Sequence, residues 1–279
     1  DIYNVIHSEF VPLFNPFQSY FDHLPSWDGV SDPIGDLADT VHVKSDQAEF
    51  RDYFRKWFVG ILPALLDDTV VNHEILVLIG EQGLYKTTWF NFLPPELRCY
   101  FYTKTNSDRL NKDDLFSLTE FALICFEELD GMRPAELNQL KAMVTMPYVN
   151  ERAAYGRNKE RHPHIASFCG TGNNVQFLTD PTGNRRWLPF EVSQIRDPHL
   201  HAIPYELVYS QAYALWKSGF CHWFSQEEIR KLNMHNSRFE VPNLEEDLIR
   251  THFRKPFEGE AGIFVTAADI LEQISSCLR

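Results

Sequence analysis

The sequence predicts an α/β fold built around a parallel sheet. Three largely apolar runs have the length of strands, and they lie within "EILVLIG" (74–80), "FALICF" (121–126) and "HIASFCGTGN" (164–173). Runs in which nearly every side chain is apolar are typical of strands buried on both faces. Segments with helical spacing separate the runs, and such alternation favours a parallel sheet covered by helices.

The segments before the first run are predicted to be helical. Residues 1–47 contain prolines and glycines that interrupt the apolar pattern, which indicates short helices joined by turns in an N-terminal lead-in. Residues 48–66 place large apolar side chains at helical spacing, and we expect Pro63 to end or kink that helix.

Helices are also expected after the apolar runs. One should begin near Lys86 and stop before Pro94, because the residue before a proline disfavours helical geometry. Another should lie within 133–145, with Pro134 in its first turn. From about residue 205 onward the pattern is helical, and 264–274 resembles the start of a small module such as a winged helix. We therefore expect a lead-in (1–47), a core (48–195) and a C-terminal helical region (196–279).

Composition narrows the class of protein. The chain has 279 residues, of which 44% are hydrophobic, so it can bury one large core or two smaller ones. No apolar run reaches the roughly 18 residues of a membrane span, and the N-terminus lacks a secretory pattern, so we expect a cytoplasmic protein with no membrane partner. A formal charge of −13 argues against coating nucleic acid with the whole surface but leaves a local basic patch open. Five widely spaced cysteines without a CxxC pair exclude a zinc ribbon and indicate reduced thiols.

The segment "LIGEQGLYKTTWF" (78–90) has the pattern of a phosphate-binding loop. In such loops glycines let backbone N–H groups converge on phosphates, a lysine reaches the β and γ phosphates, and the next hydroxyl holds Mg²⁺. Tyr85 replaces the usual small residue before the lysine, which is compatible with binding if its ring points away from the phosphates. A positive φ would be costly there. The matching residues are Gly80, Gly83, Lys86 and Thr87, with Thr88 as a second hydroxyl.

Polar residues follow the other two apolar runs. Glu127 and Glu128 come directly after the second run, where Mg²⁺ and an attacking water require carboxylates. Which glutamate supports Mg²⁺ and which activates water stays open, and Asp130 is a weaker third candidate. Asn173, at the end of the third run, is expected to orient the water beside the γ phosphate.

Two arginines complete this series of polar groups. Arg185 and Arg186 follow a Gly-Asn turn, and guanidinium groups are suited to stabilising charge on a transferring phosphoryl group.

Taken together, these segments resemble the virulence-associated protein E family of prophages and mobile elements. The matching segments are "LIGEQGLYKTTWF", "EELDGM", "ELNQLKAMVT", "ERAAYGR", "FCGTGN" and "TGNRRWLPF", and the similarity extends upstream to "YFDHLPSWDG" and downstream through "YSQAYALWKSG". That family is similar to superfamily-three helicases and to the ATPase half of primase-helicases. The resemblance implies a P-loop NTPase core of the AAA+ and superfamily-three type, between the helical lead-in and the C-terminal helical module.

The resemblance also implies roles for individual residues. In ring ATPases an arginine commonly enters the neighbouring subunit's site, so the resemblance implies a homo-oligomer, namely a hexameric ring. It assigns ATP and Mg²⁺ to Lys86 and Thr87, the acid of "ELD" to Glu128, the sensor to Asn173 and the arginine finger to Arg185 or Arg186.

A basic segment lies between the acidic pair and the third run. It contains Arg152, Arg157, Lys159 and Arg161 within an acidic chain. In superfamily-three helicases this interval forms a hairpin that lines the ring's channel, and the Gly and Asn of "YGRNK" suit its turn. Such tips would follow the backbone of single-stranded or forked DNA without reading bases. The alternative is a solvated loop that pairs with the acidic surface.

Three functions remain open from the sequence. The first is a motor, a helicase-like ATPase that acts during replication of a mobile element or prophage. The second is a small-molecule P-loop phosphotransferase, and the third is a nucleotide-responsive assembly module in which Tyr85 suppresses turnover. No zinc site is expected at His162 and His164, because no third ligand lies nearby in the sequence. His164 also stands where the family pattern suggests an arginine.

Overall fold

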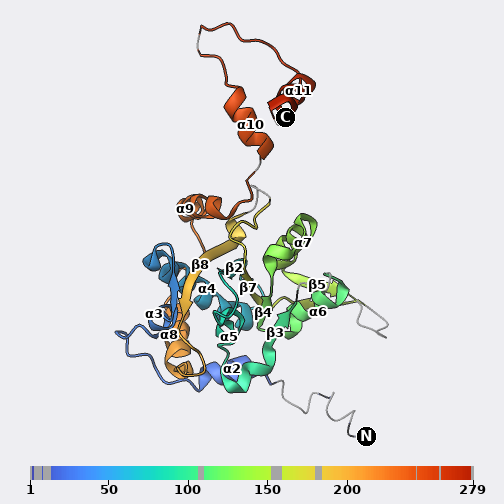
Figure 1. Cartoon of the computed structure of the whole chain (residues 1–279). Coiled ribbons are helices and arrows are strands. Elements are labelled where there is room, and N and C mark those ends of the chain that lie inside the picture. Colours follow the sequence, from blue (N-terminus) through green and yellow to red (C-terminus); the bar gives the residue numbers. More distant parts are fainter. Residues whose placement is uncertain are drawn as a thin grey trace.

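The computed structural model describes residues 2, 8, 14–105, 110–151, 159–179, 184–242, 244–257 and 259–277. Its main body is a six-stranded sheet with helices on both faces, and one pair of helices stands apart from that body (Figure 1). The mixed α/β fold with a mostly parallel sheet is therefore confirmed.

The sheet has the strand order β1-β8-β2-β7-β4-β3. β1 runs antiparallel to β8, and every other neighbouring pair is parallel. From β2 the chain crosses to the far edge, returns through β4 and β7, and then places β8 on the other side of β2. In open parallel sheets such a reversal creates a crevice at the carboxyl ends of the strands. The strands are β1 (Val41–Val43), β2 (Ile75–Ile79), β3 (Phe101–Lys104), β4 (Leu123–Phe126), β7 (Ser167–Gly172) and β8 (Trp187–Ile195).

Side chains of the central strands enter two separate cores. On β2, Leu76 and Leu78 join one core, whereas Ile75, Val77 and Ile79 join the other. This burial on both faces explains why the strand is a continuous apolar run. The first core packs against α2 (Pro16–Asp22), α3 (Pro33–Ala38), α4 (Gln47–Leu66), α5 (Lys86–Phe90) and α8 (Tyr205–Lys217), and the second against α6 (Lys112–Glu120) and α7 (Pro134–Val144).

The long helix α4 is the centre of the first core. Asp46 caps its first turn by accepting from the backbone N–H groups of Ala48 and Glu49. Trp57 is fully buried, and its Nε1 donates to Phe168 O of β7 at 3.0 Å. Pro63 lies inside α4, which continues to its C-cap at Asp67, so Pro63 does not end the helix.

Carboxylates of the lead-in attach it to this core: Asp39 pairs with Arg51 at 2.6 Å, and Asp32 has several partners. Asp32, the N-cap of α3, accepts from Arg51 (2.8 Å) and Arg55 (2.5 Å) of α4 and from Gln211 Nε2 (2.9 Å) of α8. The lead-in also supplies β1, the antiparallel edge strand of the sheet. Its last strand and last helix are therefore structurally continuous with the core.

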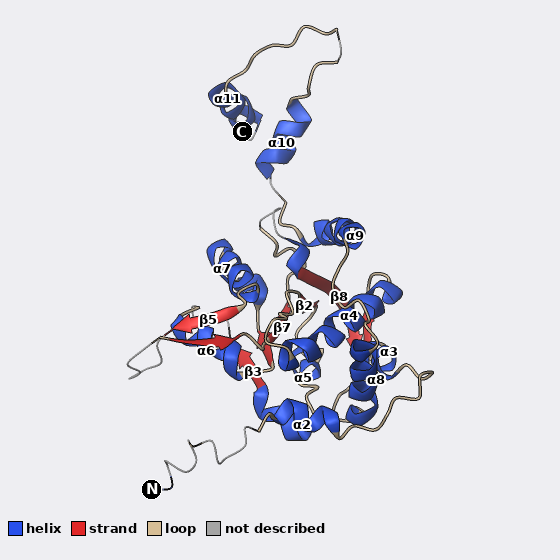
Figure 2. Cartoon of the chain, turned by 180° about the vertical axis from the view of Figure 1, so that it is seen from behind, coloured by secondary structure: helices blue, strands red, loops and turns tan. Residues whose placement is uncertain are grey.

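A two-stranded antiparallel ribbon projects beside α6 and α7 (Figure 2). It consists of β5 (Tyr148–Glu151) and β6 (Glu160–Pro163), as the hairpin prediction requires, and residues 152–158 between them lie outside the described residues.

The chain beyond β8 is helical, as its pattern predicts. α9 (Gln226–Asn236) packs on β8 and on the short helix η3 (Asn184–Arg186), whereas α10 (Leu244–His252) and α11 (Ala267–Cys277) contact each other and stand away from the body in Figures 1 and 2. No helix in the described part of the chain is both long and apolar enough to cross a membrane.

Three strands of the sheet were not predicted. β1 and β3 have only three and four residues, too few to show a period. β8 contains Pro189, and a proline normally argues against a central strand because it cannot donate to the ladder. β1 pairs with β8 only from Val192 to Ile195, so Pro189 lies in a stretch of β8 that pairs with β2 and not with β1.

Candidate functional site

The loop after β2 is shaped by two glycines. Gly80 N donates to Gly172 O of β7 at 3.1 Å, and a Cβ on Gly80 would lie 2.8 Å from Val192 O, so the backbone of β8 passes too close for a side chain. Gly83 has a φ of +84°, which glycine adopts without steric cost. α5 then begins at Lys86, with Tyr85 as its N-cap.

Lys86 lies beneath this loop with only 8% of its surface exposed. Its Nζ donates to Gly80 O (2.6 Å), Glu81 O (2.7 Å) and Asn173 Oδ1 (3.3 Å). Burial lowers the pKa of Lys86, and the Asp130 carboxylate opposes that shift. An ammonium group has three N–H donors, so an anion that accepts from Nζ must replace one of these three bonds.

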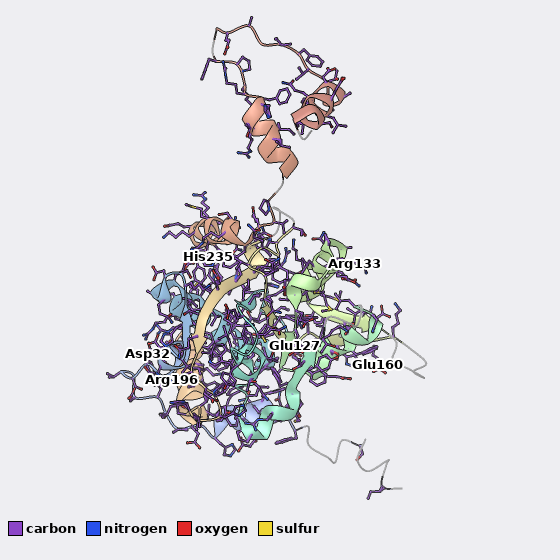
Figure 3. All side chains as sticks on the ribbon, in the orientation of Figure 1. Asp32, Glu127, Arg133, Glu160, Arg196 and His235 are labelled. Atoms are coloured by element: carbon purple, nitrogen blue, oxygen red, sulfur yellow. The ribbon has the colours of Figure 1, made fainter. Side chains whose placement is uncertain are left out.

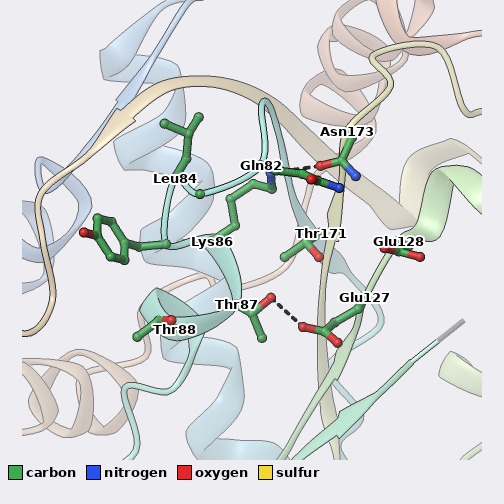
Figure 4. Close-up of a pocket in the computed structure, with 11 residues that line it drawn as sticks. Gln82, Leu84, Lys86, Thr87, Thr88, Glu127, Glu128, Thr171 and Asn173 are labelled. Carbon is green, nitrogen blue, oxygen red and sulfur yellow. Dashed lines mark hydrogen bonds between the residues drawn. The ribbon is translucent and has the colours of Figure 1, made fainter.

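A hydrogen bond joins α5 to the acidic pair, Glu127 and Glu128. Thr87 Oγ1, in the first turn of α5, donates to Glu127 Oε1 at 2.9 Å (Figure 4). Glu127 directly follows β4 and is held by its own N–H, which donates to Lys104 O of β3. Glu128, the next residue, lines the same cavity. The groups that the sequence expected to share a site therefore do lie together.

Asp130 orders the end of β7. Its carboxylate oxygens accept from the backbone N–H groups of Asn173 (3.1 Å) and Asn174 (2.9 Å). Glycines on β7 make room for the turn that carries Asp130, because a Cβ on Gly170 would collide with Leu129 and one on Gly172 would lie 3.0 Å from Asp130 Oδ1. Both Asp130 oxygens have backbone partners, which favours a positioning role over the catalytic role considered from the sequence.

These groups line one cavity of about 360 Å³ at the carboxyl ends of β2, β4 and β7 (Figure 4). Three of its residues were not predicted. Thr171 stands out in the sequence only as the residue between two glycines at a strand end, and the loop pattern specifies no residue type at Gln82 and Leu84. The lining residues are Gln82, Gly83, Leu84, Tyr85, Lys86, Thr87, Thr88, Glu127, Glu128, Thr171 and Asn173.

Backbone strain is concentrated at this cavity. Among the described residues, Tyr85 (φ +60°) and Glu128 (φ +55°) are the two non-glycine residues with positive φ, and both line it. The left-handed conformation costs an ordinary residue about 1–2 kcal/mol, and such outliers cluster at functional sites. Tyr85 thus has the backbone conformation that the sequence identified as costly.

The ring of Tyr85 is directed toward the segment after β8. It packs edge-on against His199, with 6.1 Å between ring centroids, and 40% of the residue's surface is exposed. His199 does not line the cavity that contains Lys86. The ring therefore contacts a neighbouring segment of the chain beside the cavity.

Arg185 and Arg186 lie at the amino ends of the strands, opposite to the cavity. They directly precede β8, and the parallel register places Trp187 opposite Ile75, the first residue of β2. The cavity, in contrast, lies beyond the last residue of β2. Arg185 is exposed, and burial lowers the pKa of the partly buried Arg186, as does the charge of Arg185. The two arginines do not belong to the cavity of their own chain.

The ribbon β5–β6 displays part of the predicted basic segment. Lys159 and Arg161 are exposed, and the Arg161 guanidinium lies over the Tyr148 ring at 3.6 Å from its centroid. Glu160, labelled in Figure 3, places a negative charge between them. The other two basic residues, Arg152 and Arg157, lie outside the described residues.

His164 is a buried, neutral side chain. Burial lowers its pKa to about 4, and its Nδ1 donates to Met146 O at 2.7 Å. The ring also packs edge-on against Phe168 of β7. In the described ranges, no three His, Cys, Asp or Glu side chains are grouped so that they could hold a metal ion by themselves.

Solved structures with a similar fold include two of the NrS-1 C terminal region. One, described as the A form apo structure of residues 305–718, has a TM-score of 0.52 and 12% identity, and the match covers 83% of this chain and 55% of that chain. The other, an apo structure of the same region, has a TM-score of 0.51 and 12% identity and covers 92% of this chain and 64% of that chain. The present chain thus spans less than two thirds of either, and the likeness concerns the fold.

Sequence comparison identifies the family. No curated protein matches the chain. The virulence-associated protein E-like domain matches residues 22–241, which include the whole sheet, the cavity and the ribbon. The chain therefore belongs to the virulence-associated protein E-like family.

Proposed function

We propose that this chain is a P-loop NTPase that binds ATP with Mg²⁺ and hydrolyses it to drive helicase-like movement on DNA during replication of a mobile element or prophage. The contact between Thr87 Oγ1 and Glu127 Oε1 carries the proposal, because it brings the two halves of a nucleotide site together in a cavity that also contains Lys86 and Asn173. The position of the cavity at the strand-order reversal supports ligand binding there.

The oxygen donors fit Mg²⁺. Thr87 and Glu127 offer a hydroxyl and a carboxylate 2.9 Å apart, and Mg²⁺ is usually bound by one or two carboxylates together with phosphate and water oxygens. When these two residues hold the ion, the hydrogen bond between them would be broken. Bound Mg²⁺ would supply charge neutralisation on the phosphates.

The remaining polar groups have separate roles in this proposal. Lys86 donates to the phosphates after giving up a carbonyl of its own loop. Because Glu127 is the glutamate that contacts Thr87, Glu128 is left to accept the proton of the attacking water, and Asn173 orients that water. Asp130 holds Asn173 in place through the backbone N–H.

The arginines are assigned to a neighbouring copy of the chain. Arg185 and Arg186 lie at the amino ends of the strands, whereas the cavity lies at the carboxyl ends, so they cannot act on a nucleotide bound by their own chain without rearrangement. A ring of six copies would bring one subunit's arginines to the next subunit's phosphates. The exposed ribbon residues Lys159 and Arg161 would then contact single-stranded or forked DNA.

Two observations support a second candidate, an assembly module with little turnover. Lys86 is bonded to the carbonyls of its own loop, and Tyr85 is held in a strained conformation beside it. A protein of this kind would bind nucleotide and assemble without rapid hydrolysis. The phosphotransferase is less well supported, because no arginine is among the described residues that line the cavity.

Substitution of Lys86 tests the nucleotide site. Lys86→Ala removes a charge-assisted donor, so we expect ATP affinity, measured by calorimetry with Mg²⁺, to fall about 10- to 100-fold. Phosphate release with and without single-stranded DNA should fall with it. Lys231→Ala, which removes an exposed lysine on α9, is the control and should behave like the wild type. Equal ATP affinity of wild type and Lys86→Ala would contradict the proposal, whereas binding without turnover in the wild type would favour the assembly module.

A further inference from the structure

A second cavity of about 340 Å³ is formed partly by the two segments that carry Tyr85 and its ring partner His199, although neither of these residues lines it. Three segments form it: α3 with the turn that follows, α5, and residues 196–204 after β8. Its apolar wall includes Leu37, Trp89 and Ile203, and its polar groups include Asp36, Arg196 and His201. A mostly apolar wall with a few polar groups is the usual make-up of a small-molecule site, and the volume lies in the usual range.

Hydrogen bonds join the three segments. Trp89, which is 2% exposed, donates from Nε1 to Thr40 Oγ1 at 2.8 Å, and Arg196 N donates to Thr40 O at 2.8 Å. Arg196 is labelled in Figure 3 near the lead-in. His199 N donates to Asp197 Oδ1 at 2.9 Å, which fixes the turn that carries His199. The wall of the second cavity is therefore held in place by its own contacts.

Two structural links place the two cavities side by side. Tyr85 lines the first cavity and Trp89 the second, and Trp89 N donates to Tyr85 O at 2.8 Å, so the two residues are one helical turn apart. The Tyr85 ring also contacts His199, which lies between Pro198 and His201 of the second cavity. Tyr85 therefore lines the first cavity and lies next to two of the segments that form the second, largely apolar cavity.

We propose that the second cavity receives the base of the nucleotide and that Tyr85, supported by His199, is the aromatic side chain against which the nucleoside packs. The proposal rests on the proposed phosphate site. A nucleoside triphosphate has charged phosphates at one end and a flat apolar base at the other, which matches the order of the two cavities. The strained backbone of Tyr85 then has a function, because a glycine at this position would relieve the strain but provide no ring.

Ligands with and without a base test this inference. We expect Tyr85→Gly to weaken Mg²⁺-ATP binding about 10-fold, since stacking on an aromatic ring is worth about that factor per base, and to leave tripolyphosphate binding unchanged or tighter. Tyr85→Phe should bind ATP like the wild type, and His199→Ala should show a smaller loss. His42→Ala, an exposed histidine on β1, is the control.

The outcomes separate this inference from the function on which it rests. If the wild type binds ATP and Tyr85→Gly binds it equally well, the base site is wrong and the phosphate site stands. If the wild type binds neither ATP nor tripolyphosphate, the proposed function fails and the base site fails with it. Photolabelling with 8-azido-ATP gives an independent readout, because the labelled peptides should contain residues 85–89 or 196–204. Labelling confined to other segments would overturn the assignment.

Discussion

The carboxyl ends and the amino ends of the parallel strands, called here the carboxyl edge and the amino edge of the sheet, differ in how completely their polar groups are paired. At the carboxyl edge, Lys86 donates to a carbonyl of its own loop and Thr87 donates to Glu127. All three residues line a cavity within one chain. At the amino edge, Arg185 is exposed and no hydrogen-bond partner of Arg186 Nε lies among the described residues. The residues at the carboxyl ends line a cavity within one chain, whereas the two arginines matter for turnover only under the proposal that they act on a neighbouring copy.

The largest effect should come from the arginines of the amino edge. If they act on a neighbour's nucleotide, Arg185→Ala with Arg186→Ala should lower turnover about 10³-fold and leave ATP affinity nearly unchanged. Mixing this variant with Lys86→Ala subunits should restore part of the ATPase activity, because some interfaces then combine an intact cavity with intact arginines. Arg98→Ala is the matched control, since Arg98 is exposed and also precedes a strand, β3, which lies on the far side of the sheet from β8. If the mixture restored no activity, the proposal that these arginines act on the nucleotide of a neighbouring copy would be contradicted.

A smaller effect is expected at the carboxyl edge from Asp130→Ala. Loss of the two backbone contacts should shift Asn173, and we expect kcat to fall about 10-fold with KM for ATP within about 2-fold, because misplacement by about 1 Å is costly for turnover. Asp67→Ala removes another carboxylate that accepts from a backbone N–H and should leave both constants unchanged. A rise in KM with unchanged kcat would show that Asp130 acts on binding instead.

The smallest effect concerns Glu74, which directly precedes β2 at the amino edge. Burial raises its pKa from 4.5 to about 7, with Lys56 and Arg185 opposing the shift. The folded state then binds more protons than the unfolded state between these values, so this group's contribution to stability falls as pH rises from about 4.5 to about 7. Glu74→Gln should reduce the loss of unfolding free energy between about pH 4.5 and about pH 7 by about 1–3 kcal/mol. Urea unfolding at several pH values measures this change. Glu120→Gln, an exposed glutamate on α6, is the control, and an unchanged pH profile in Glu74→Gln would show that the carboxyl is not the cause.

Local pattern was sufficient for much of the fold. The three apolar runs are β2, β4 and β7, because strands buried on both faces must be apolar throughout. The loop at Lys86 and the acids at Glu127 were also recognisable from residue type and position after a strand. Asp130 was not recognised as a positioning residue, since its partners are backbone groups far along the chain.

The sequence by itself determined which residues follow each strand, since the apolar runs and the turn residues after them are local signals. Only the tertiary structure decided which of these strand ends lie on the same side of the sheet. The parallel pairing of β8 with β2 puts Arg185 and Arg186 opposite the cavity, although they follow Asn173 closely in the chain. The direction of the Tyr85 ring was likewise decided by packing against His199, since backbone conformation and long-range contacts, not residue type, set where a side chain points.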